Sequence, residues 1–287
     1  MKLIYALCGL LLANAAWAAA PDMMVDSIRM PAWVERGAQR QPLAVGMELG
    51  SGDALVTGQG SRVLLRSADG SDIGLGENAR FVLSSIGWQH ENHPRFVAVL
   101  EVDKGAFRFT TRPGGKPHDR EVTLKVAGAT VTTGGADMWG QAGEDGNGML
   151  LLVAGAASVA YGSAAPIALD QPLTSVVMTR GAAPLPMSGI GQKRLDKLMQ
   201  ETAIGAGQGA VRSGGRWKVN LMEKDGQAAT LQAYDSLRAA GYDARILPLA
   251  KGKYRLRIIQ LPSRAEAEAL AADLRGKMGI VAPGVSR

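Results

Sequence analysis

Short apolar runs separated by turn residues dominate the chain from residue 25 to about residue 180, and this pattern constrains the fold most. The clearest hairpin signal is Asp69-Gly70, because glycine accepts the positive φ that a tight turn needs. Strands at this spacing predict an all-β domain over residues 21–180, built as a sandwich, barrel or β-roll. The expected strands include Ser61–Arg66, Phe96–Val102, Ala106–Thr111, Val122–Val126, Met149–Val153 and Ala157–Tyr161.

The pattern changes to mixed helix and strand over residues 216–287. Asp225 is expected to cap a helix that turns Leu231, Tyr234 and Leu237 inward, and Ser263-Arg-Ala-Glu266 reads as a capping box. The order β-α-β-β-α-β predicts an α+β, ferredoxin-like domain, so the chain is multidomain. The expected elements are strand 217–222, helix 225–240, strands 244–249 and 254–259, helix 263–278 and strand 280–282.

A linker is expected between these regions, over residues 181–215. It begins and ends with glycine- and proline-rich sequence, which favours a flexible connection. Ile190, Leu195, Leu198 and Met199 lie near helical spacing and indicate a short amphipathic helix inside it.

The first twenty residues have the organisation of a secretory signal peptide. Lys2 precedes an apolar stretch that is short for a membrane span, and Ala16-Trp17-Ala18 supplies small residues for cleavage after Ala18 or Ala20. Cys8 is the only cysteine and leaves with this peptide, so the mature chain has no disulfide and no thiol nucleophile. We therefore expect a bacterial periplasmic protein with no stable membrane span after cleavage.

The positive charge belongs to the C-terminal third. Residues 21–185 hold 14 Lys and Arg against 17 Asp and Glu, a net charge of −3. Residues 186–287 hold 17 against 9, a net charge of +8. The search for a polyanionic or polar polymeric partner therefore concentrates on the C-terminal domain.

The C-terminal segment resembles a SPOR domain over about seventy residues. The similarity is carried by Trp217–Met222, Tyr254–Leu261 and the helix start Ser263–Leu270. The resemblance implies binding to peptidoglycan glycan strands stripped of stem peptides, which are enriched at division septa. The sequence departs from the family pattern at three positions, with Asn220 in place of glutamine and Met222 and Ile259 in place of glycines.

The N-terminal segment is similar to FecR-like periplasmic domains over about 130 residues. The similar motifs are Leu43–Gly46, Gly52–Gly58, Ser61–Leu65, Asp69–Ser71, Leu75–Glu77, Val102–Gly105 and Val131–Gly134. The resemblance implies a β-rich interaction or scaffold module with a periplasmic protein partner. It also leaves open a role in a FecR-type sigma/anti-sigma signalling system.

Strand alternation gives the glycan hypothesis specific residues. On the first and third strands, Val219, Leu221, Leu256 and Ile258 are expected to face the helices. The opposite face then forms the candidate glycan site, which combines hydrogen-bonding groups for hydroxyl and acetamido groups with apolar surface for sugar rings. The candidate residues are Lys218, Asn220, Met222, Arg255, Arg257 and Ile259. A merely solvated polar sheet face is the plain alternative.

The sequence offers little for other chemistry. The predicted face lacks the paired aromatic residues of RNA-binding sheets, and an exported protein rarely meets RNA, so no nucleic-acid partner is expected. His90 and His93 read as a solvated hairpin and His118 stands apart from them, so no metal is expected. Glu101 and Asp103 share one face of a strand without a pocket signature, and Trp33, Trp88 and Trp139 read as packing residues.

Together these observations predict a non-catalytic envelope protein without a cofactor. Its SPOR-like domain, residues 216–287, would bind peptidoglycan, and its FecR-like domain, residues 21–180, would contact a protein partner during cell division or wall maintenance.

Overall fold

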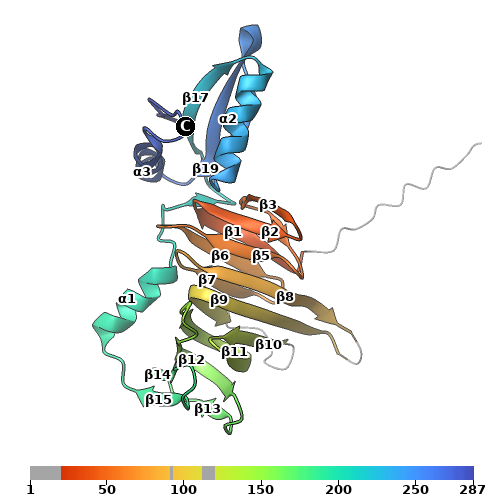
Figure 1. Cartoon of the computed structure of the whole chain (residues 1–287), viewed down its shortest axis with the longest axis vertical. Coiled ribbons are helices and arrows are strands. Elements are labelled where there is room, and N and C mark those ends of the chain that lie inside the picture. The colour runs from red at the N-terminus through yellow and green to blue at the C-terminus, as the bar shows by residue number, and fades with distance from the viewer. Residues whose placement is uncertain (1–20, 91–92, 112–119) are drawn as a thin grey trace, which may run out of the picture.

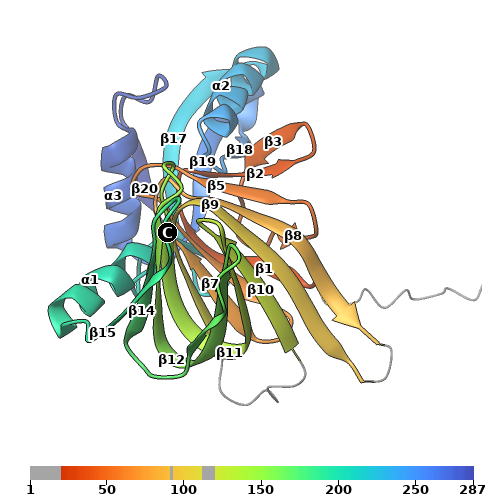
Figure 2. The same ribbon diagram turned by 60° about the horizontal axis from the view of Figure 1, so that its bottom comes forward.

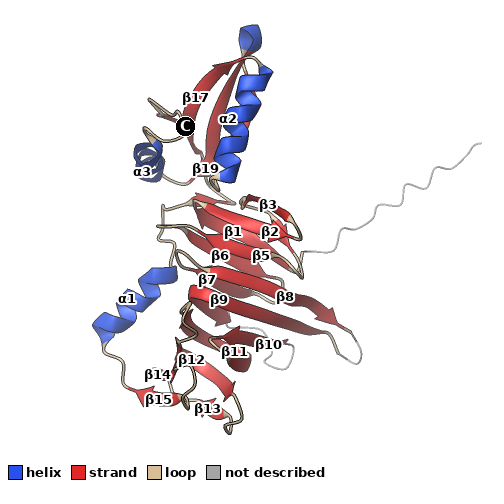
Figure 3. Cartoon of the chain, in the orientation of Figure 1, coloured by secondary structure: helices blue, strands red, loops and turns tan. Residues whose placement is uncertain are grey.

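The computed structural model describes residues 21–90, 93–111 and 120–287, so the expected signal peptide and His118 lie outside the described residues. Strands build one large sheet in the N-terminal part, and a smaller sheet with two helices forms the C-terminal part (Figures 1 and 3). The all-β prediction for the first region and the mixed prediction for the last region are therefore confirmed at this level.

The large sheet has 16 strands among the described residues, ordered β15-β14-β12-β11-β10-β9-β7-β6-β1-β16 along its main path. The pairing of β10 with β9 is parallel, whereas the other strand pairs among the described residues of this sheet are antiparallel. Its strands are β1 (Met23–Arg29), β2 (Ala32–Arg36), β3 (Gln39–Pro42), β4 (Glu48–Leu49), β5 (Ala54–Thr57), β6 (Arg62–Ser67), β7 (Ser71–Leu75), β8 (Arg80–Gln89), β9 (Arg95–Thr111), β10 (Arg120–Val126), β11 (Ala129–Ala142), β12 (Gly148–Tyr161), β13 (Ile167–Leu169), β14 (Thr174–Met178), β15 (Leu185–Ser188) and β16 (Ala210–Val211).

Long strands connect successive parts of this sheet. The first half of β9 pairs with β8 and β10, and its second half pairs with β7 and β11. The two short strands expected at 96–102 and 106–111 are thus one strand, and β12 likewise joins 149–153 to 157–161. Gly105 makes the continuous path of β9 possible, because its φ is +87° and a side-chain Cβ there would lie 2.5 Å from Ala79 Cα.

Aromatic side chains fill the core of the large sheet. All four phenylalanines of the chain, Phe81, Phe96, Phe107 and Phe109, are at most 1% exposed. Trp139 is completely buried in a second cluster, where it packs with Leu151 and Leu198. The packing role expected for Trp139 is confirmed, whereas Trp88 is 39% exposed and stacks edge-on against Phe96.

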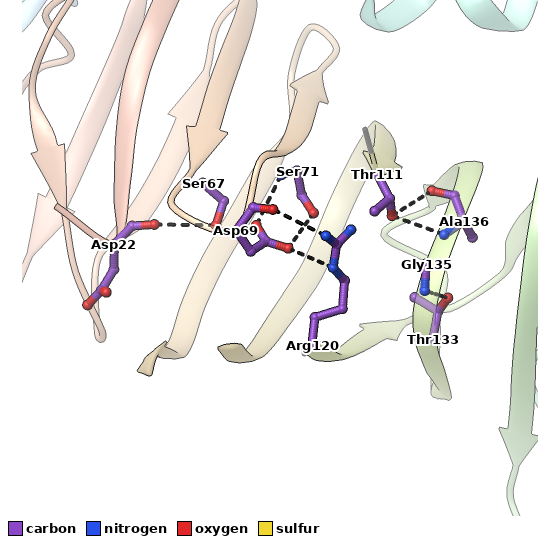
Figure 4. A network of polar contacts seen from close by, with 9 residues as sticks. All are labelled: Asp22, Ser67, Asp69, Ser71, Thr111, Arg120, Thr133, Gly135 and Ala136. Carbon is purple, nitrogen blue, oxygen red and sulfur yellow. Dashed lines mark hydrogen bonds and ion pairs between the residues drawn. The ribbon is translucent and has the colours of Figure 1, made fainter. Parts of the chain in front are cut away.

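A buried ion pair ties the β6–β7 turn to the start of β10 (Figure 4). Arg120 Nε lies 3.5 Å from Asp69 Oδ2, and both side chains are at most 5% exposed. Asp69 also accepts hydrogen bonds from the backbone N–H and the hydroxyl of Ser71, at 3.0 and 2.7 Å. The predicted Asp69-Gly70 hairpin is thereby anchored to β10, through a residue fifty-one positions further along the chain.

The segment between the two sheets packs back onto the large one. It contains β15, α1 (Gln192–Thr202) and β16. Helix α1 lies beside the large sheet, with Leu198 packed in the Trp139 cluster and its last turn against β7 (Figures 1 and 2). Strand β16 then pairs with β1 at the end of the main strand path, so the chain passes directly from one sheet to the other.

The C-terminal part forms a four-stranded antiparallel sheet with the order β18-β19-β17-β20. Its elements are β17 (Trp217–Asp225), α2 (Gln227–Ala239), β18 (Arg245–Pro248), the 3-10 turn η2 (Ala250–Gly252), β19 (Lys253–Leu261), α3 (Arg264–Leu274) and β20 (Gly284–Ser286). Ser263 caps α3 by accepting a hydrogen bond from the Glu266 N–H at 3.1 Å, which is one half of the predicted capping box; the Glu266 side chain does not bond back to Ser263.

Several local expectations for this part were wrong. Asp225 is the last residue of β17, and Gly226, with φ +78°, takes the N-cap position of α2 without a side-chain bond. Leu231 points outward and is 43% exposed, because Thr230 and Leu237 occupy the buried side of α2. Helix α3 ends four residues before the expected Met278, and the fourth strand lies at 284–286 rather than 280–282.

The two parts meet through β2 and the C-terminal end of α2. The indole Nε1 of Trp33 donates to the carbonyl of Ala239 at 3.0 Å, and the Ala32 N–H donates to the carbonyl of Gly241 at 3.1 Å. Gly241 allows this approach, because a Cβ there would lie 2.6 Å from Trp33 Cε2 and its φ is +82°. Arg40 covers the Trp33 ring at 4.4 Å, so Trp33 packs between the two parts.

Candidate functional site

The small sheet has one covered face and one uncovered face. Val219, Leu221, Leu256 and Ile258 are at most 2% exposed and share a cluster with Leu237 of α2 and Leu274 of α3. The inward set expected from strand alternation is therefore confirmed. We call the uncovered face the open face. Its residues are Lys218, Asn220, Glu223, Arg245, Leu247, Arg255, Arg257 and Ile259.

Arg257 occupies the middle of this open face. The strand register places it opposite Asn220 on β17 and opposite Arg245 on β18. Within the described residues, Arg257 has no hydrogen-bond or ion-pair partner, and its Nε is shielded from solvent. The side chain is half-buried, so its remaining guanidinium donors are held at the surface without a partner of their own.

The polar neighbours of Arg257 already use some of their hydrogen-bonding groups. Asn220 Nδ2 donates to Ser286 Oγ at 3.1 Å, and Lys218 Nζ donates to the carbonyl of Arg287 at 3.1 Å. Arg255 donates twice to Glu223 Oε1, at 3.0 and 2.6 Å. The open face therefore presents amide and guanidinium donors together with one carboxylate, on a surface of net positive charge.

One end of the open face carries a further charge pair. Arg245 Nη2 donates to Asp243 Oδ2 at 3.0 Å. Burial raises the pKa of Asp243 above its usual value, and the charge and hydrogen bond of Arg245 oppose that rise. Arg245 is half-exposed, so it can contact a ligand while it remains paired with Asp243.

The structure separates the sequence-predicted site residues into two groups. Lys218, Asn220, Arg255, Arg257 and Ile259 lie on the open face. Met222 does not, because a bulge between Asn220 and Met222 interrupts the alternation. Met222 lies opposite the buried Leu256 and packs against the core cluster, and Glu223 takes the expected place opposite Arg255.

Sequence reasoning missed four residues near this face. Glu223 was missed because nothing in the sequence marks the bulge. Ser286 was missed because the fourth strand was expected four residues earlier, at 280–282 instead of 284–286. Arg245 and Leu247 alternate outward on a strand that was expected, so the same period-2 rule could have found them.

The described residues do not form a metal site, and Glu101 and Asp103, the carboxylates considered for hydrolysis, are each bound to other side chains. Within residues 21–90, 93–111 and 120–287, no group of three or more His, Cys, Asp or Glu is arranged to hold a metal ion. Glu101 bonds to Lys125 Nζ and Ser84 Oγ, both at 2.8 Å, and Asp103 pairs with Arg80. The hydrogen bonds from Lys125 and Ser84 lower the pKa of Glu101, so it stays ionised at neutral pH. None of the helices described is long and apolar enough to cross a membrane.

Comparison with known families agrees with this division of the chain. The family model described as FecR protein matches residues 53–158, and the model described as SPOR domain matches residues 213–287. The chain thus carries a FecR domain and a C-terminal SPOR domain. No curated protein gives a significant match.

Among solved structures, two crystal structures of a protein described as a candidate anti-sigma factor from Parabacteroides distasonis ATCC 8503 are similar to the chain. Each is 13% identical, covers 77% of this chain and 89% of its own, and has a TM-score of 0.41. At that score the similarity carries no conclusion about this chain.

Proposed function

We propose that this protein is a non-catalytic, periplasmic peptidoglycan-binding protein that holds glycan strands on the open face of its SPOR domain. The match of residues 213–287 to the SPOR family carries the proposal, since SPOR domains bind peptidoglycan. The strand order β18-β19-β17-β20 with antiparallel pairs supports the ferredoxin-like assignment of this domain. The FecR domain would act as the interaction module, in cell division or wall maintenance.

The chemistry of the open face fits a sugar polymer. Asn220 offers an amide for sugar hydroxyl and acetamido groups, and Leu247 and Ile259 offer apolar contact area for the ring faces. Arg257 offers donors that no described residue uses. A bound glycan would therefore not have to displace an existing partner of Arg257.

The charge of the open face gives a reason to prefer stripped strands. Hydrolysis of the amide between a glycan and its stem peptide releases the peptide and leaves one carboxylate on the lactyl group that stays on the sugar. Arginine binds carboxylates through two parallel N–H donors, and these charge-assisted bonds are stronger than neutral ones. Arg257 and Arg255 lie two positions apart on β19, so we expect the open face to bind the stripped strand more tightly than the peptide-bearing strand.

Co-sedimentation with purified sacculi tests this proposal. The chain without residues 1–20 is mixed with sacculi before and after amidase removal of stem peptides. Arg257→Met removes the guanidinium and keeps most of the aliphatic stem. Hydrogen bonds to charged groups contribute about 1.5–3 kcal/mol, so we expect roughly 10- to 100-fold weaker binding to amidase-treated sacculi.

Arg264→Met is the matched control. Arg264 lies on α3, pairs with Glu268 at 2.8 Å and is 70% exposed away from the sheet. We expect it to sediment like the unmodified chain. Absence of sedimentation from both sacculus preparations, or equal binding by Arg257→Met and Arg264→Met, would contradict the proposal.

A signalling role is the second candidate function, favoured by the FecR match at residues 53–158. In that role the β domain would contact a sigma/anti-sigma partner across the envelope. Crosslinking of the chain in cells, followed by identification of its partners, distinguishes the roles. A resident anti-sigma partner together with no wall binding would favour signalling over wall attachment.

A further inference from the structure

A cavity lies where the two parts of the chain meet. This junction cavity has a volume of about 530 Å³, within the range of small-molecule sites. It lies between the β1 end of the large sheet and helix α3, next to the place where β16 leads into the SPOR domain. Clefts between domains are a common location for ligands.

Apolar side chains from both parts form much of the cavity wall. Ile28 and Met30 contribute from the FecR part, and Leu261 and Leu270 contribute from the SPOR part. Ile28 and Leu261 are almost completely buried in the core cluster, so this wall is fixed by packing. An aliphatic group that entered the cavity would exchange water contact for contact with these side chains.

Glu266 is the unusual group in this cavity. It is 8% exposed and lines the cavity from the first turn of α3. Its backbone N–H is capped by Ser263, but within the described residues its carboxylate has no hydrogen bond and no ion pair. A carboxylate at the wall of a cavity that has no cation partner can accept hydrogen bonds from a ligand.

The other charged groups of the cavity are placed differently. Asp273 is already paired with Lys277 at 2.7 Å and lies within 3.4 Å of the Tyr242 hydroxyl. Arg29 lines the cavity from β1 and is exposed. Glu266 is therefore the carboxylate of this cavity that lacks a cation.

The geometry points to a binding site in the junction cavity for a small ligand that carries an ammonium group on an aliphatic stem. The ammonium would donate to Glu266, and the stem would lie against Met30, Leu261 and Leu270. This site is separate from the open face and does not depend on glycan binding. Because both parts of the chain line it, a bound ligand would hold them together.

Binding of 1,5-diaminopentane, measured by calorimetry and by amide chemical shifts on the chain without residues 1–20, tests this site. Hexanoate, which has a similar stem and no ammonium, is the counter-probe. We expect the diamine to bind and to shift amides on both sides of the junction, near Ile28–Met30 and near Leu261–Leu270. Hexanoate is expected to shift neither group.

Two substitutions assign the interaction to Glu266. Glu266→Gln keeps the size of the side chain and the backbone N–H that Ser263 caps but removes the charge, and we expect at least about tenfold weaker binding of the diamine. Glu268→Gln on the outer side of the same helix, where Glu268 pairs with Arg264, should bind like the unmodified chain.

Ala269→Leu narrows the cavity with Glu266 intact, and it should also weaken binding, which keeps the test valid if Glu266→Gln folds poorly. The proposal is wrong if neither probe binds, if hexanoate binds as well as the diamine, or if Glu266→Gln and Ala269→Leu both bind like Glu268→Gln.

Discussion

The two sheets use their charged side chains in different ways. In the large sheet, several arginines form ion pairs with carboxylates of the same region, as in Arg36–Asp53 at 2.6 Å and Arg108–Asp137 at 2.7 Å. On the open face of the small sheet, Arg257 has no partner among the described residues, and Lys218 bonds only to a backbone carbonyl. The small sheet also holds ion pairs, Arg255–Glu223 and Arg245–Asp243, but Arg257 and Lys218 have no carboxylate partner among the described residues and remain available for a ligand.

Net charge alone is a coarse guide to where a ligand-binding surface lies. The FecR region has many ionic groups and a net charge of −3 over residues 21–185, because its cations and anions are nearly balanced. Residues 186–287 carry a net charge of +8, and a sheet with one uncovered face displays part of it. A ligand surface therefore requires unpaired charge at a defined place as well as an excess of charge.

The largest expected effect comes from the buried pair of the large sheet. Asp69→Ala leaves Arg120 unpaired in the interior, so we expect the free energy of unfolding to fall by about 3–5 kcal/mol. Urea denaturation measures this change. The double variant Asp69→Ala with Arg120→Met should recover most of the loss, since no unpaired charge then remains buried.

Asp225→Ala in the small sheet is the matched surface control. Asp225 lies 3.6 Å from Lys253, and the two side chains are 83% and 52% exposed. We expect a change within about 0.5 kcal/mol. Similar losses for Asp69→Ala and Asp225→Ala would remove the distinction between the two sheets.

Trp33→Ala tests whether the two parts unfold together. The substitution removes the hydrogen bond to Ala239 and the contact with Gly241, and a half-buried aromatic residue of this size contributes about 2–3 kcal/mol. We expect one calorimetric transition in the unmodified chain and two in the variant. Trp88→Ala, at the exposed end of a hairpin, should leave a single transition. Two transitions in the unmodified chain would show that this junction does not couple the parts.

The pH dependence of stability should also reside in the large sheet. Burial alone would raise the pKa of Asp53, but hydrogen bonds from Arg36 and the Gly50 N–H outweigh it and lower the pKa. Because the folded-state pKa is depressed, this contribution is present above the unfolded pKa of about 3.9 and is lost as pH falls through the folded value.

Asp53→Asn should therefore cost about 2 kcal/mol at pH 7 and progressively less as the pH falls below about 4. Urea denaturation of both chains between pH 7 and pH 3 measures the difference. A loss that stays constant over this range would assign the effect to packing instead of ionisation.

The sequence was informative where local rules decide the structure. The Asp69-Gly70 hairpin and the Ser263 cap followed from turn and capping chemistry, which involves neighbouring residues only. The inward set Val219, Leu221, Leu256 and Ile258 followed from a period of two. These features predicted the strand-rich first region and most of the open face.

The remaining features depend on contacts between distant residues. The bulge that turns Met222 toward the core is a property of the pairing with β19, and the sequence of β17 contains no mark of it. The partner of Asp69 lies fifty-one residues away in the sequence, and Trp33 contacts Gly241 although the two are far apart in the sequence. The junction cavity combines residues 28–31 with residues 261–277, so pattern reading within either segment could not find it.

The smallest expected effect concerns catalysis in the large sheet. Glu101 is the carboxylate that a wall hydrolase on this domain would use, but the hydrogen bonds from Lys125 and Ser84 keep its pKa low, which disfavours a role as proton donor. We expect no clearing of peptidoglycan in zymograms by the unmodified chain. Glu101→Gln should leave sacculus binding unchanged and alter the free energy of unfolding by less than about 1 kcal/mol, because the Glu101–Lys125 pair is partly exposed to solvent. Clearing by the unmodified chain that disappears in Glu101→Gln would instead make the large sheet a catalytic domain, and its paired charges would then serve chemistry as well as stability.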